Sequence, residues 1–321
     1  MMIQSVKHHF MAILSAFHRR KKRSLLGVLA LFLFCLLYSY ERATHTQYKQ
    51  DGFLLVPDSR CHVNPPFLVI LVTSAMNKNK ARAAIRQTWG KETTIGNNRI
   101  VTYFLLGYSA HYQQQLLDES LQHNDIIQQN FTDSYYNLTT KVLMGMEWVT
   151  RFCPSASFVM KTDADMFVNI YYLQELLATK NRNNFFTGEV RFNRSPMRRQ
   201  NSQWYVKEEE YPHPTYPPFS SGGGYVLSSD IAKKIWDISA QVAKFKLEDV
   251  YIGMCLVELK IIPVDMCLRK VFFTRKVKFH VCRFRKLVTS HRHSPEELLL
   301  FWKALMNSTR NDCPTERKNS Y

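Results

Sequence analysis

The sequence lacks several patterns that would reveal a function at once. No C-x-x-C pair occurs among its seven cysteines, which argues against a zinc ribbon. No internal repeat is present, and no Gly/Ser-rich or Pro-rich linker divides the chain after its N-terminal segment. Its run of consecutive glycines, at 222–224, fits neither the G-x-G-x-x-G fingerprint nor a P-loop. These absences favour one large domain behind an N-terminal segment.

Acidic residues are scarce in comparison with basic ones. The 321 residues include 43 Lys and Arg against 26 Asp and Glu, so the formal net charge is +17 at pH 7. With 45% hydrophobic and 21% charged residues, the composition excludes a disordered tail and a multi-span membrane protein. The excess of positive charge indicates an acidic partner, which is nucleic acid, an anionic membrane surface or an acidic small-molecule substrate.

Part of that charge lies at the N-terminus, where residues 1–23 contain no acid and six basic side chains. Residues 24–40 follow without a charge, and a membrane-spanning helix needs roughly 17 to 25 apolar residues. The positive-inside rule then predicts a cytoplasmic tail at 1–23, a transmembrane signal anchor at 24–40 and a single-pass type II topology. A cleaved signal peptide is the alternative, but no small-residue cleavage pattern follows the apolar run. We interpret 41–60 as a stem and 61–321 as a lumenal catalytic domain.

The cysteines and the glycosylation motifs agree with a lumenal location. Six cysteines lie beyond the predicted anchor, and an even number in an oxidising compartment predicts disulfides, although six cysteines allow fifteen connectivities. Four N-x-[ST] sequons predict glycosylation at Asn130, Asn137, Asn193 and Asn307. A lumenal domain without a zinc-finger or RNA-stacking signature argues against nucleic acid as the partner.

Strand-like and helix-like segments alternate along the domain. Buried-strand patterns occur at 67–72, 100–106 and 157–161, and helix patterns occur at 80–90, 112–121 and 136–151. This alternation predicts an α/β fold with a mixed, mainly parallel sheet. In such sheets ligands bind outside the carboxyl ends of the strands, so the residues that follow the strands are candidates for function.

Three motifs carry groups suited to catalysis or binding. Asp163 and Asp165 directly follow the third predicted strand, and two carboxylates at this spacing can hold Mg²⁺ or Mn²⁺ with a phosphate, although aspartates that cap a helix are the alternative. The glycines at 222–224 indicate either a closely approached backbone or an ordinary loop that enters a strand. Glu248 and Asp249 either supply a general base or are acids favoured at a helix N-terminus.

Five ordered segments spread across most of residues 65–310: A-I-R-Q-T-W-G (84–90), D-S-Y-Y-N-L-T-T-K (133–141), V-M-K-T-D-A-D-M-F-V-N (159–169), Y-P-P-F-S-S-G-G-G-Y-V-L-S (216–228) and L-E-D-V-Y-I-G-M-C-L (247–256). In this order they resemble the animal β-1,3-glycosyltransferase family, which includes β-1,3-galactosyltransferases and β-1,3-N-acetylglucosaminyltransferases. The resemblance implies a GT-A nucleotide-sugar fold, a type II enzyme of the Golgi membrane, a UDP-sugar donor and Mn²⁺ as cofactor.

The resemblance also implies roles for individual residues. Asp165 would be the direct metal ligand, with Asp163 beside it and His291 completing the site. Asp249 would be the catalytic base. Further contacts are implied for the uridine (Thr73, Ser74), for the nucleotide and pyrophosphate (Arg82, Arg86) and for the substrates (Trp89, Tyr216, Gly222, Gly223, Gly224, Glu248).

The implied reaction is a single inverting displacement. It moves galactose from UDP-galactose, in β-1,3 linkage, onto a terminal GlcNAc or GalNAc of a glycoprotein or glycolipid glycan. Transfer of N-acetylglucosamine from UDP-GlcNAc to galactose-terminated acceptors is the alternative within the family. Paired carboxylates also occur in glycosidases, and a catalytically silent glycan-binding protein is a further alternative. The acids at 163, 165 and 249 are all present, which favours an active transferase.

Overall fold

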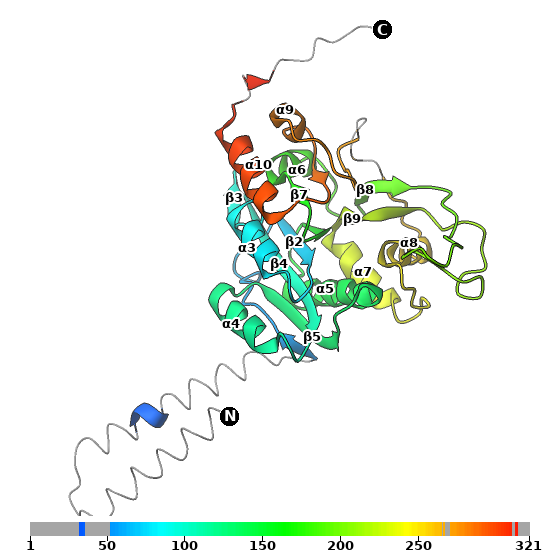
Figure 1. The fold of residues 1–321 in the computed structure, drawn as a ribbon, viewed down its shortest axis with the longest axis horizontal. Helices are drawn as coiled ribbons and strands as arrows, with labels where there is room; N and C mark the ends of the chain where they lie inside the picture. The colour runs from blue at the N-terminus through cyan, green and yellow to red at the C-terminus, as the bar shows by residue number, and fades with distance from the viewer. Residues whose placement is uncertain (1–31, 36–51, 265, 267–269, 310–311, 314–321) are drawn as a thin grey trace, which may run out of the picture. The chain divides into compact units, whose positions relative to one another are not determined.

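The computed structural model describes residues 32–35, 52–264, 266, 270–309 and 312–313 (Figure 1). The larger of its two compact units begins at Gly52. The predicted tail at 1–23, and all of the predicted anchor at 24–40 except residues 32–35, lie outside the described residues. Within the part of the chain that is described, no helix is long and apolar enough to cross a membrane.

A mixed sheet forms the centre of the larger unit. Its neighbouring strands follow the order β1 (Phe53–Leu55), β5 (Ile126–Thr132), β4 (Asn98–Tyr108), β2 (Leu68–Thr73), β6 (Phe158–Asp163), β9 (Phe219–Ser228) and β8 (Phe186–Arg191), with β3 (Thr93–Ile95) also paired to β4. The central pairings of β2 with β4 and β6, and of β4 with β5, are parallel. The pairings of β1, β3, β8 and β9 are antiparallel. The structure therefore confirms a mixed sheet with a parallel centre.

The parallel centre follows from continuous apolar runs. Every residue of β2 is buried, as a strand covered on both faces requires. Helix α5 (Leu138–Phe152) covers one face, and Gly145 brings it close, because a Cβ at this position would come within 2.8 Å of Leu105 and 3.0 Å of Leu71. The strand patterns predicted at 67–72, 100–106 and 157–161 correspond to β2, β4 and β6.

The helices connect and cover these strands. They are α3 (Asn79–Gln87), α4 (Gln113–His123), α5, α6 (Ile170–Leu177), α7 (Ser229–Ile238), α8 (Glu248–Glu258), α9 (Val281–Phe284) and α10 (Pro295–Asn307), with a 3₁₀ turn at Tyr135–Asn137. Helix α10 begins at a capping box, in which the Ser294 side chain accepts from the Glu297 backbone and the Glu297 side chain accepts from the Ser294 backbone. The helices predicted at 80–90, 112–121 and 136–151 correspond to α3, α4 and α5.

One strand lies where the sequence predicts a stem. Phe53 and Leu55 of β1 are fully buried, and β1 pairs with β5. The folded unit thus extends into the segment 41–60. A three-residue strand is too short to produce a periodicity signal, which explains why the sequence pattern did not reveal it.

Two disulfides link distant segments of the folded unit. Cys61 is bonded to Cys153, and Cys282 is bonded to Cys313. Cys255 of α8 is a free, buried thiol. Cys267 lies outside the described residues. The sequence predicted disulfides without their connectivity, and the structure supplies two of the pairs.

Candidate active site

The carboxyl ends of β2 and β6 lie side by side. Thr73 ends β2 and is in register with Asp163, which ends β6. The Thr73 hydroxyl donates a hydrogen bond of 2.6 Å to Asp163 Oδ1. This contact orients Asp163 before the chain turns to Asp165. Parallel strands thus bring a candidate nucleotide contact and a candidate metal ligand to one edge of the sheet.

A small second sheet brings His291 to the same edge. Strand β7 (Phe167–Val168) pairs with β10 (Thr289–Ser290), which directly precedes His291. The His293 backbone N–H also donates to the Asp165 carbonyl at 2.9 Å. As a result, ligand atoms of Asp163, Asp165 and His291 lie within 4.8 Å of one another.

The imidazole of His291 is oriented for metal binding. Its Nδ1 lies 3.1 Å from the Thr274 carbonyl, and a carbonyl only accepts, so Nδ1 carries the proton. Nε2 is thereby directed toward the carboxylates, 3.2 Å from Asp165 Oδ2. This is the outer contact that commonly fixes a metal-ligating histidine.

The contact between His291 and Asp165 shifts the pKa of both residues. The hydrogen bond to Asp165 raises the pKa of His291, although partial burial opposes it. Burial acts to raise the pKa of Asp165, but the hydrogen bond and the charge of His291 outweigh it and lower that pKa. Two carboxylates and one imidazole form a donor set that fits a divalent ion such as Mn²⁺, so these residues could hold a metal.

Lys161 is a central residue that the sequence pattern does not reveal. It lies on β6, is fully buried, and its Nζ donates to Asp163 Oδ1 at 2.8 Å and to the Gly222 carbonyl. Glu248 Oε2 lies 3.3 Å from the same nitrogen. Burial acts to lower the pKa of Lys161, but Asp163 and Glu248 outweigh it and raise that pKa. One cation therefore connects the predicted metal site with the start of α8.

Asp249 lies at the first turn of α8, beside β9. Its Oδ2 accepts from the Gly222 N–H at 3.2 Å, and its Oδ1 accepts from the Val250 N–H at 2.9 Å. A Cβ at Gly222 would lie 3.3 Å from Glu248 Oε2, so glycine allows β9 to pass this close to the helix. Burial raises the pKa of Asp249, although these N–H donors and Lys161 oppose the increase. A carboxylate with a raised pKa is suited to accept a proton.

Glu248, the neighbouring acid, is buried in the protein. Its Oε1 accepts from the Tyr225 hydroxyl at 2.6 Å, and only 3% of the residue is exposed. Burial raises the pKa of Glu248 to about 7, although Lys161 opposes the shift. Its contacts indicate that it positions Lys161, and its role as a substrate contact stays a prediction.

The two predicted pyrophosphate arginines form ion pairs within the protein. Arg82 is 1% exposed and contacts Glu119 Oε2 at 2.6 Å, while it donates to the Ala75 carbonyl at 2.8 Å and to the Ser74 hydroxyl at 3.2 Å. Arg82 therefore braces the turn that follows β2.

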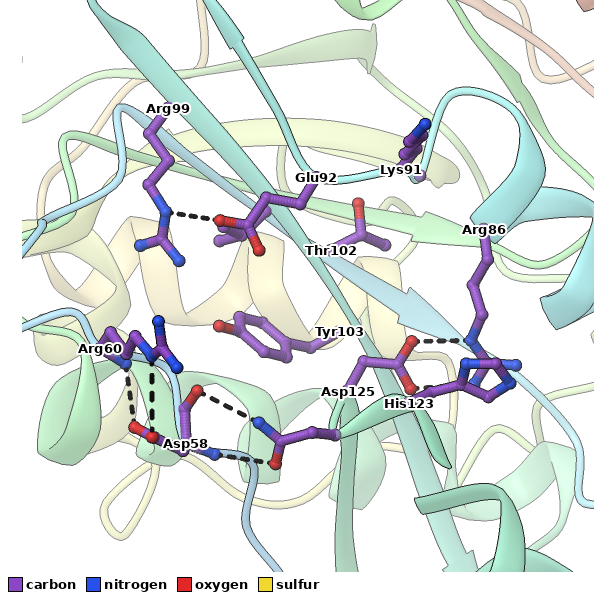
Figure 2. A pocket seen from close by; sticks show the side chains of 13 residues that line it. Asp58, Arg60, Arg86, Lys91, Glu92, Arg99, Thr102, Tyr103, His123 and Asp125 are labelled. Atoms are coloured by element: carbon purple, nitrogen blue, oxygen red, sulfur yellow. Dashed lines mark hydrogen bonds and ion pairs between the residues drawn. The ribbon is translucent and has the colours of Figure 1, made fainter. Parts of the chain in front are cut away.

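Arg86 lies further from the metal group. It contacts Glu119 at 2.8 Å and Asp125 at 2.7 Å, and its guanidinium lies 4.8 Å from the centre of the Phe104 ring. It lines a separate cavity, which Figure 2 shows. The structure thus does not bring Arg86 together with the carboxylates of the sheet edge.

The turn after β2 is fixed from a second side. Lys141 of α5 donates to the Ser74 carbonyl and to Asp133 Oδ1, both at 2.6 Å. Asp133 Oδ2 accepts in turn from the Gly107 N–H at 2.9 Å. Asp133 and Lys141, the first and last residues of the D-S-Y-Y-N-L-T-T-K segment, therefore form an ion pair. This pair holds the turn after β2, where the uridine is expected to bind.

Three predicted substrate contacts are core residues. Trp89 is fully buried, and Tyr216 is 7% exposed, with its ring against Tyr211 and Phe245. Gly224 is buried inside β9, where it pairs with Thr162 of β6. These three groups are buried in this structure, and their roles as substrate contacts stay predictions. Gly223 is also in β9, and a Cβ there would approach Thr274 and Met166 at 3.2 and 3.5 Å.

Two exposed aromatic side chains lie together, and one of them, Tyr135, lies near Asp249. Tyr135 is 47% exposed and Trp204 is 49% exposed. Partial burial and the charge of Asp249 raise the pKa of Tyr135, while a hydrogen bond with Trp204 opposes the shift. The sequence predicts a role for neither residue. Tyr135 lies in the D-S-Y-Y-N-L-T-T-K segment and Trp204 lies outside the five segments, so only the structure brings them together.

The four predicted glycosylation sites differ in accessibility. Asn130, Asn193 and Asn307 are exposed. Asn137 is half-buried, and its side-chain amide donates to the Thr132 carbonyl at 2.8 Å. Three of the sequons therefore present a free surface for a glycan.

Known proteins resemble this chain in sequence over most of its length. The family model described as Galactosyltransferase matches residues 80–267. Beta-1,3-galactosyltransferase 5 of Mus musculus is 45% identical over 304 residues, which cover 92% of this chain and 99% of that protein. Beta-1,3-galactosyltransferase 5 of Homo sapiens is 50% identical over 271 residues, which cover 83% and 87%. The galactosyltransferase LgtC, solved with donor and acceptor analogues, aligns with a TM-score of 0.39 and 9% identity over 76% of this chain and 98% of that one, a likeness too low to support an argument.

Proposed function

The chain belongs to the galactosyltransferase family, and from this membership we propose that it transfers galactose from UDP-galactose to a glycan acceptor in β-1,3 linkage. The observation that carries the proposal is the match with beta-1,3-galactosyltransferase 5 of Mus musculus over 99% of that protein. The grouping of Asp163, Asp165 and His291 near a separate carboxylate at the start of α8 supports it. The same residues support a nucleotide-sugar transferase over a glycosidase, since a glycosidase needs no such metal group.

Asp165 and His291 would hold Mn²⁺, with Asp163 beside them. When bound, Mn²⁺ neutralises the diphosphate of the donor and makes it a better leaving group. Thr73 and Lys161 keep Asp163 in place through hydrogen bonds of 2.6 and 2.8 Å. Fixed ligands of this kind lower the cost of reorganisation during the reaction.

Asp249 would act as the general base. Its carboxylate accepts the proton of the acceptor's 3-hydroxyl, while that oxygen attacks the anomeric carbon opposite the leaving UDP and inverts the configuration. The raised pKa of Asp249 makes it a stronger base than an exposed aspartate, and the two backbone N–H donors hold its orientation. A positioned general base contributes about 10²–10⁴-fold to the rate.

The remaining polar groups would shape the donor site. Thr73 and Ser74 lie in the turn that would contact the uridine, and Arg82 and Lys141 hold this turn by hydrogen bonds to Ser74. Arg82 would therefore act through the turn rather than on the phosphates. This assignment replaces the direct contact that the sequence predicted.

The acceptor would be a glycan with a terminal GlcNAc or GalNAc. Tyr135 and Trp204 support this part of the proposal, because exposed aromatic rings beside a catalytic base offer an apolar face on which a sugar ring can stack. A donor site for UDP-GlcNAc, with a galactose-terminated acceptor, remains the alternative. A silent glycan-binding protein is the alternative without catalysis.

A product analysis distinguishes these alternatives. The purified chain is incubated with Mn²⁺ and either UDP-galactose or UDP-GlcNAc, together with acceptors that end in GlcNAc, GalNAc or galactose. We expect UDP-galactose and a GlcNAc- or GalNAc-terminated acceptor to give a β-1,3-linked disaccharide end by NMR. A product from UDP-GlcNAc alone would contradict the proposed donor, and no product from either would contradict a transferase.

We also propose a Golgi membrane location with the folded unit in the lumen. The basic segment at 1–23, the uncharged segment at 24–40 and the four sequons support it. In cells, digestion with an N-glycosidase should lower the apparent mass of the protein. Unchanged mobility, together with protease sensitivity from the cytosolic side, would contradict this location.

A further inference from the structure

A buried carboxylate on β8, that of Glu189, is connected to the metal group through a single residue. Glu189 is 8% exposed and lies where the register of β8 with β9 shifts, between Gly188 and Val190. An irregularity of this kind can redirect a side chain. Neither Glu189 nor its partner Thr274 belongs to the five segments that carry the family resemblance. The proposed reaction therefore gives neither residue a role.

One carboxylate oxygen of Glu189 holds both polar donors of Thr274. Its Oε2 accepts from the Thr274 backbone N–H at 3.0 Å and from the Thr274 hydroxyl at 2.5 Å. The other oxygen, Oε1, accepts from Lys270 and lies 2.8 Å from Arg191 Nη2. Burial acts to raise the pKa of Glu189, but the hydrogen bonds from Lys270 and Thr274 outweigh it and lower that pKa. The side chain is therefore an ionised acceptor at neutral pH.

Thr274 lies in a segment without regular secondary structure. No helix or strand occurs between α8 and α9 among the residues that the structure describes. An isolated bridge pairs Phe272 with Thr289, which holds the segment beside β10. This bridge lies two residues before Thr274, so the contacts from Glu189 are the ones that fix Thr274 itself.

The fixed residue is the one that orients His291. The Thr274 carbonyl accepts from His291 Nδ1 at 3.1 Å, and this contact directs Nε2 toward the carboxylates of the metal group. Outer contacts that hold a metal-ligating histidine commonly contribute to metal affinity. An unbroken path of hydrogen bonds and one peptide unit thus leads from Glu189 through Thr274 to His291.

We propose that Glu189 is a positioning residue for metal binding, which acts through Thr274 to hold the His291 imidazole in its ligating orientation. This inference rests on the proposed function, because it takes Asp163, Asp165 and His291 as the metal site. Glu189 is not a member of that group. Its removal should therefore weaken metal-dependent binding of the donor and leave the transfer step itself intact.

The test measures UDP binding by purified full chains over a series of Mn²⁺ concentrations, which gives the concentration for half-maximal binding. Glu189→Met has a side chain of similar length without a carboxylate, and we expect it to raise that concentration about tenfold, at the low end of the usual range of about 10–100-fold. Glu189→Gln retains an oxygen that can accept from both donors of Thr274, so it should stay near the wild-type value. At saturating Mn²⁺, the galactosyl transfer rate of Glu189→Met should approach that of the wild type.

Glu147→Met is the matched control. Glu147 lies on α5, its side chain is 12% exposed, and it accepts from Gln129 at 2.8 Å. Its loss should leave the Mn²⁺ requirement unchanged. Thr274→Val removes the hydroxyl contact with little change of shape, and it should raise the Mn²⁺ requirement even if Glu189→Met does not fold.

Two results would overturn the positioning role in a wild-type chain that needs Mn²⁺ to bind UDP. One is an unchanged Mn²⁺ requirement in Thr274→Val and in folded Glu189→Met. The other is an equal loss in Glu189→Gln, which would assign the effect to the charge of Glu189 and not to its hold on Thr274. Wild-type UDP binding that is independent of Mn²⁺ would instead overturn the metal site of the proposed function, and the positioning role with it.

Discussion

Among the single residues, Lys161 connects more of the candidate active site than any predicted ligand does. It contacts Asp163 on its own strand, Gly222 on β9 and Glu248 on α8. Removing the cation from a buried ion pair leaves its acidic partner charged and unpaired in the protein interior. This destabilises the folded state more than replacing both partners with apolar residues does. The side chain therefore serves both the stability and the geometry of the site.

We expect Lys161→Met to lower the free energy of unfolding by about 3–5 kcal/mol, because Glu248 and Asp163 lose their shared cation. Galactosyl transfer should fall with it, since Asp163 is then held only by the hydrogen bond from Thr73. Urea unfolding followed by fluorescence measures the first effect. Adding Glu248→Gln should restore part of the stability, and a double variant less stable than Lys161→Met would contradict the pairing.

The sequence pattern predicts some of these functional residues and does not predict others, and the difference has physical reasons. Asp163 and Asp165 are predicted as metal ligands because two carboxylates at this spacing after a buried strand can hold one divalent ion, and the structure places His291 beside them. Lys161 lies inside an apolar run, where a lysine gives no periodic signal. Trp89 was predicted from its motif, but only burial decides whether a tryptophan contacts a substrate or packs in the core.

At the scale of secondary-structure elements, ion pairs join α3 to α4 and hold the turn after β2, where the donor is expected to bind. Arg82 and Arg86 both extend from α3 to Glu119 on α4. Arg82 also holds the turn after β2. A change at Glu119 should therefore affect the stability of two helices and the order of the turn between β2 and α3.

We expect Glu119→Gln to lower the free energy of unfolding by about 3 kcal/mol at pH 7, because Arg82 loses its charged partner while it stays buried. Burial opposes the shift, but the hydrogen bond from Arg82 lowers the pKa of Glu119 in the folded protein below its ordinary value of 4.5. Its stabilisation is thus complete above pH 4.5 and is lost as the pH falls through the lower folded pKa.

Unfolding of wild-type and Glu119→Gln chains between pH 7 and pH 3 measures this dependence. The difference between them should shrink below pH 4.5. Asp237→Asn, which breaks the exposed pair with Lys233, is the control and should have a much smaller effect. A difference that stays constant with pH would mean that the Glu119 charge does not contribute.

The sequence predicted the elements with strong periodicity and missed those that depend on tertiary contacts. β2, β4, β6 and α3 to α5 were predicted from apolar runs and helical spacing. The two-residue strands β7 and β10 are too short for such a signal, yet their pairing brings His291 to Asp165. Antiparallel β9 was seen only as a glycine-rich stretch, because its pairing with β6 depends on a distant segment.

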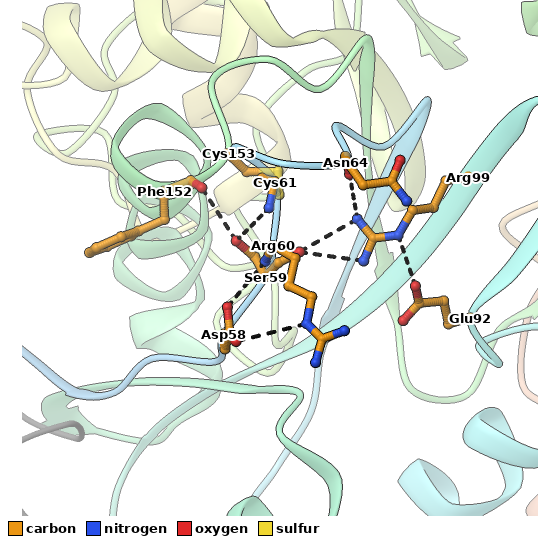
Figure 3. The surroundings of a disulfide bond; sticks show 9 residues. All are labelled: Asp58, Ser59, Arg60, Cys61, Asn64, Glu92, Arg99, Phe152 and Cys153. Atoms are coloured by element: carbon orange, nitrogen blue, oxygen red, sulfur yellow. Dashed lines mark hydrogen bonds and ion pairs between the residues drawn. A yellow bond between two sulfur atoms is a disulfide. The ribbon is translucent and has the colours of Figure 1, made fainter. Parts of the chain in front are cut away.

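At the scale of the whole molecule, the two disulfides differ most in the length of chain that they close. Cys61 and Cys153 are 92 residues apart, whereas Cys282 and Cys313 are 31 apart. In the chain-entropy model, a crosslink stabilises more when it closes a longer loop. The first disulfide (Figure 3) also fixes the residue that follows Arg60, which lines the cavity in Figure 2.

Replacing both Cys61 and Cys153 with serine should lower the free energy of unfolding by about 4–5 kcal/mol. Replacing Cys282 and Cys313 should cost about 1 kcal/mol less, because the loop is shorter. Thermal and urea unfolding of the two double variants give both values. The reverse order would show that the contacts around each bond, and not the closed loop, determine its contribution.

At the scale of the whole molecule, metal-dependent donor binding and proton removal belong to different parts of the proposed active site. Asp249→Asn tests this division most directly, with UDP binding in Mn²⁺ and the galactosyl transfer rate measured on the same preparation. We predict that UDP binds with wild-type affinity, while transfer falls by at least about 10²-fold. Asp165→Ala is the matched control and should lose the Mn²⁺-dependent binding. Near-normal transfer by Asp249→Asn would contradict the account.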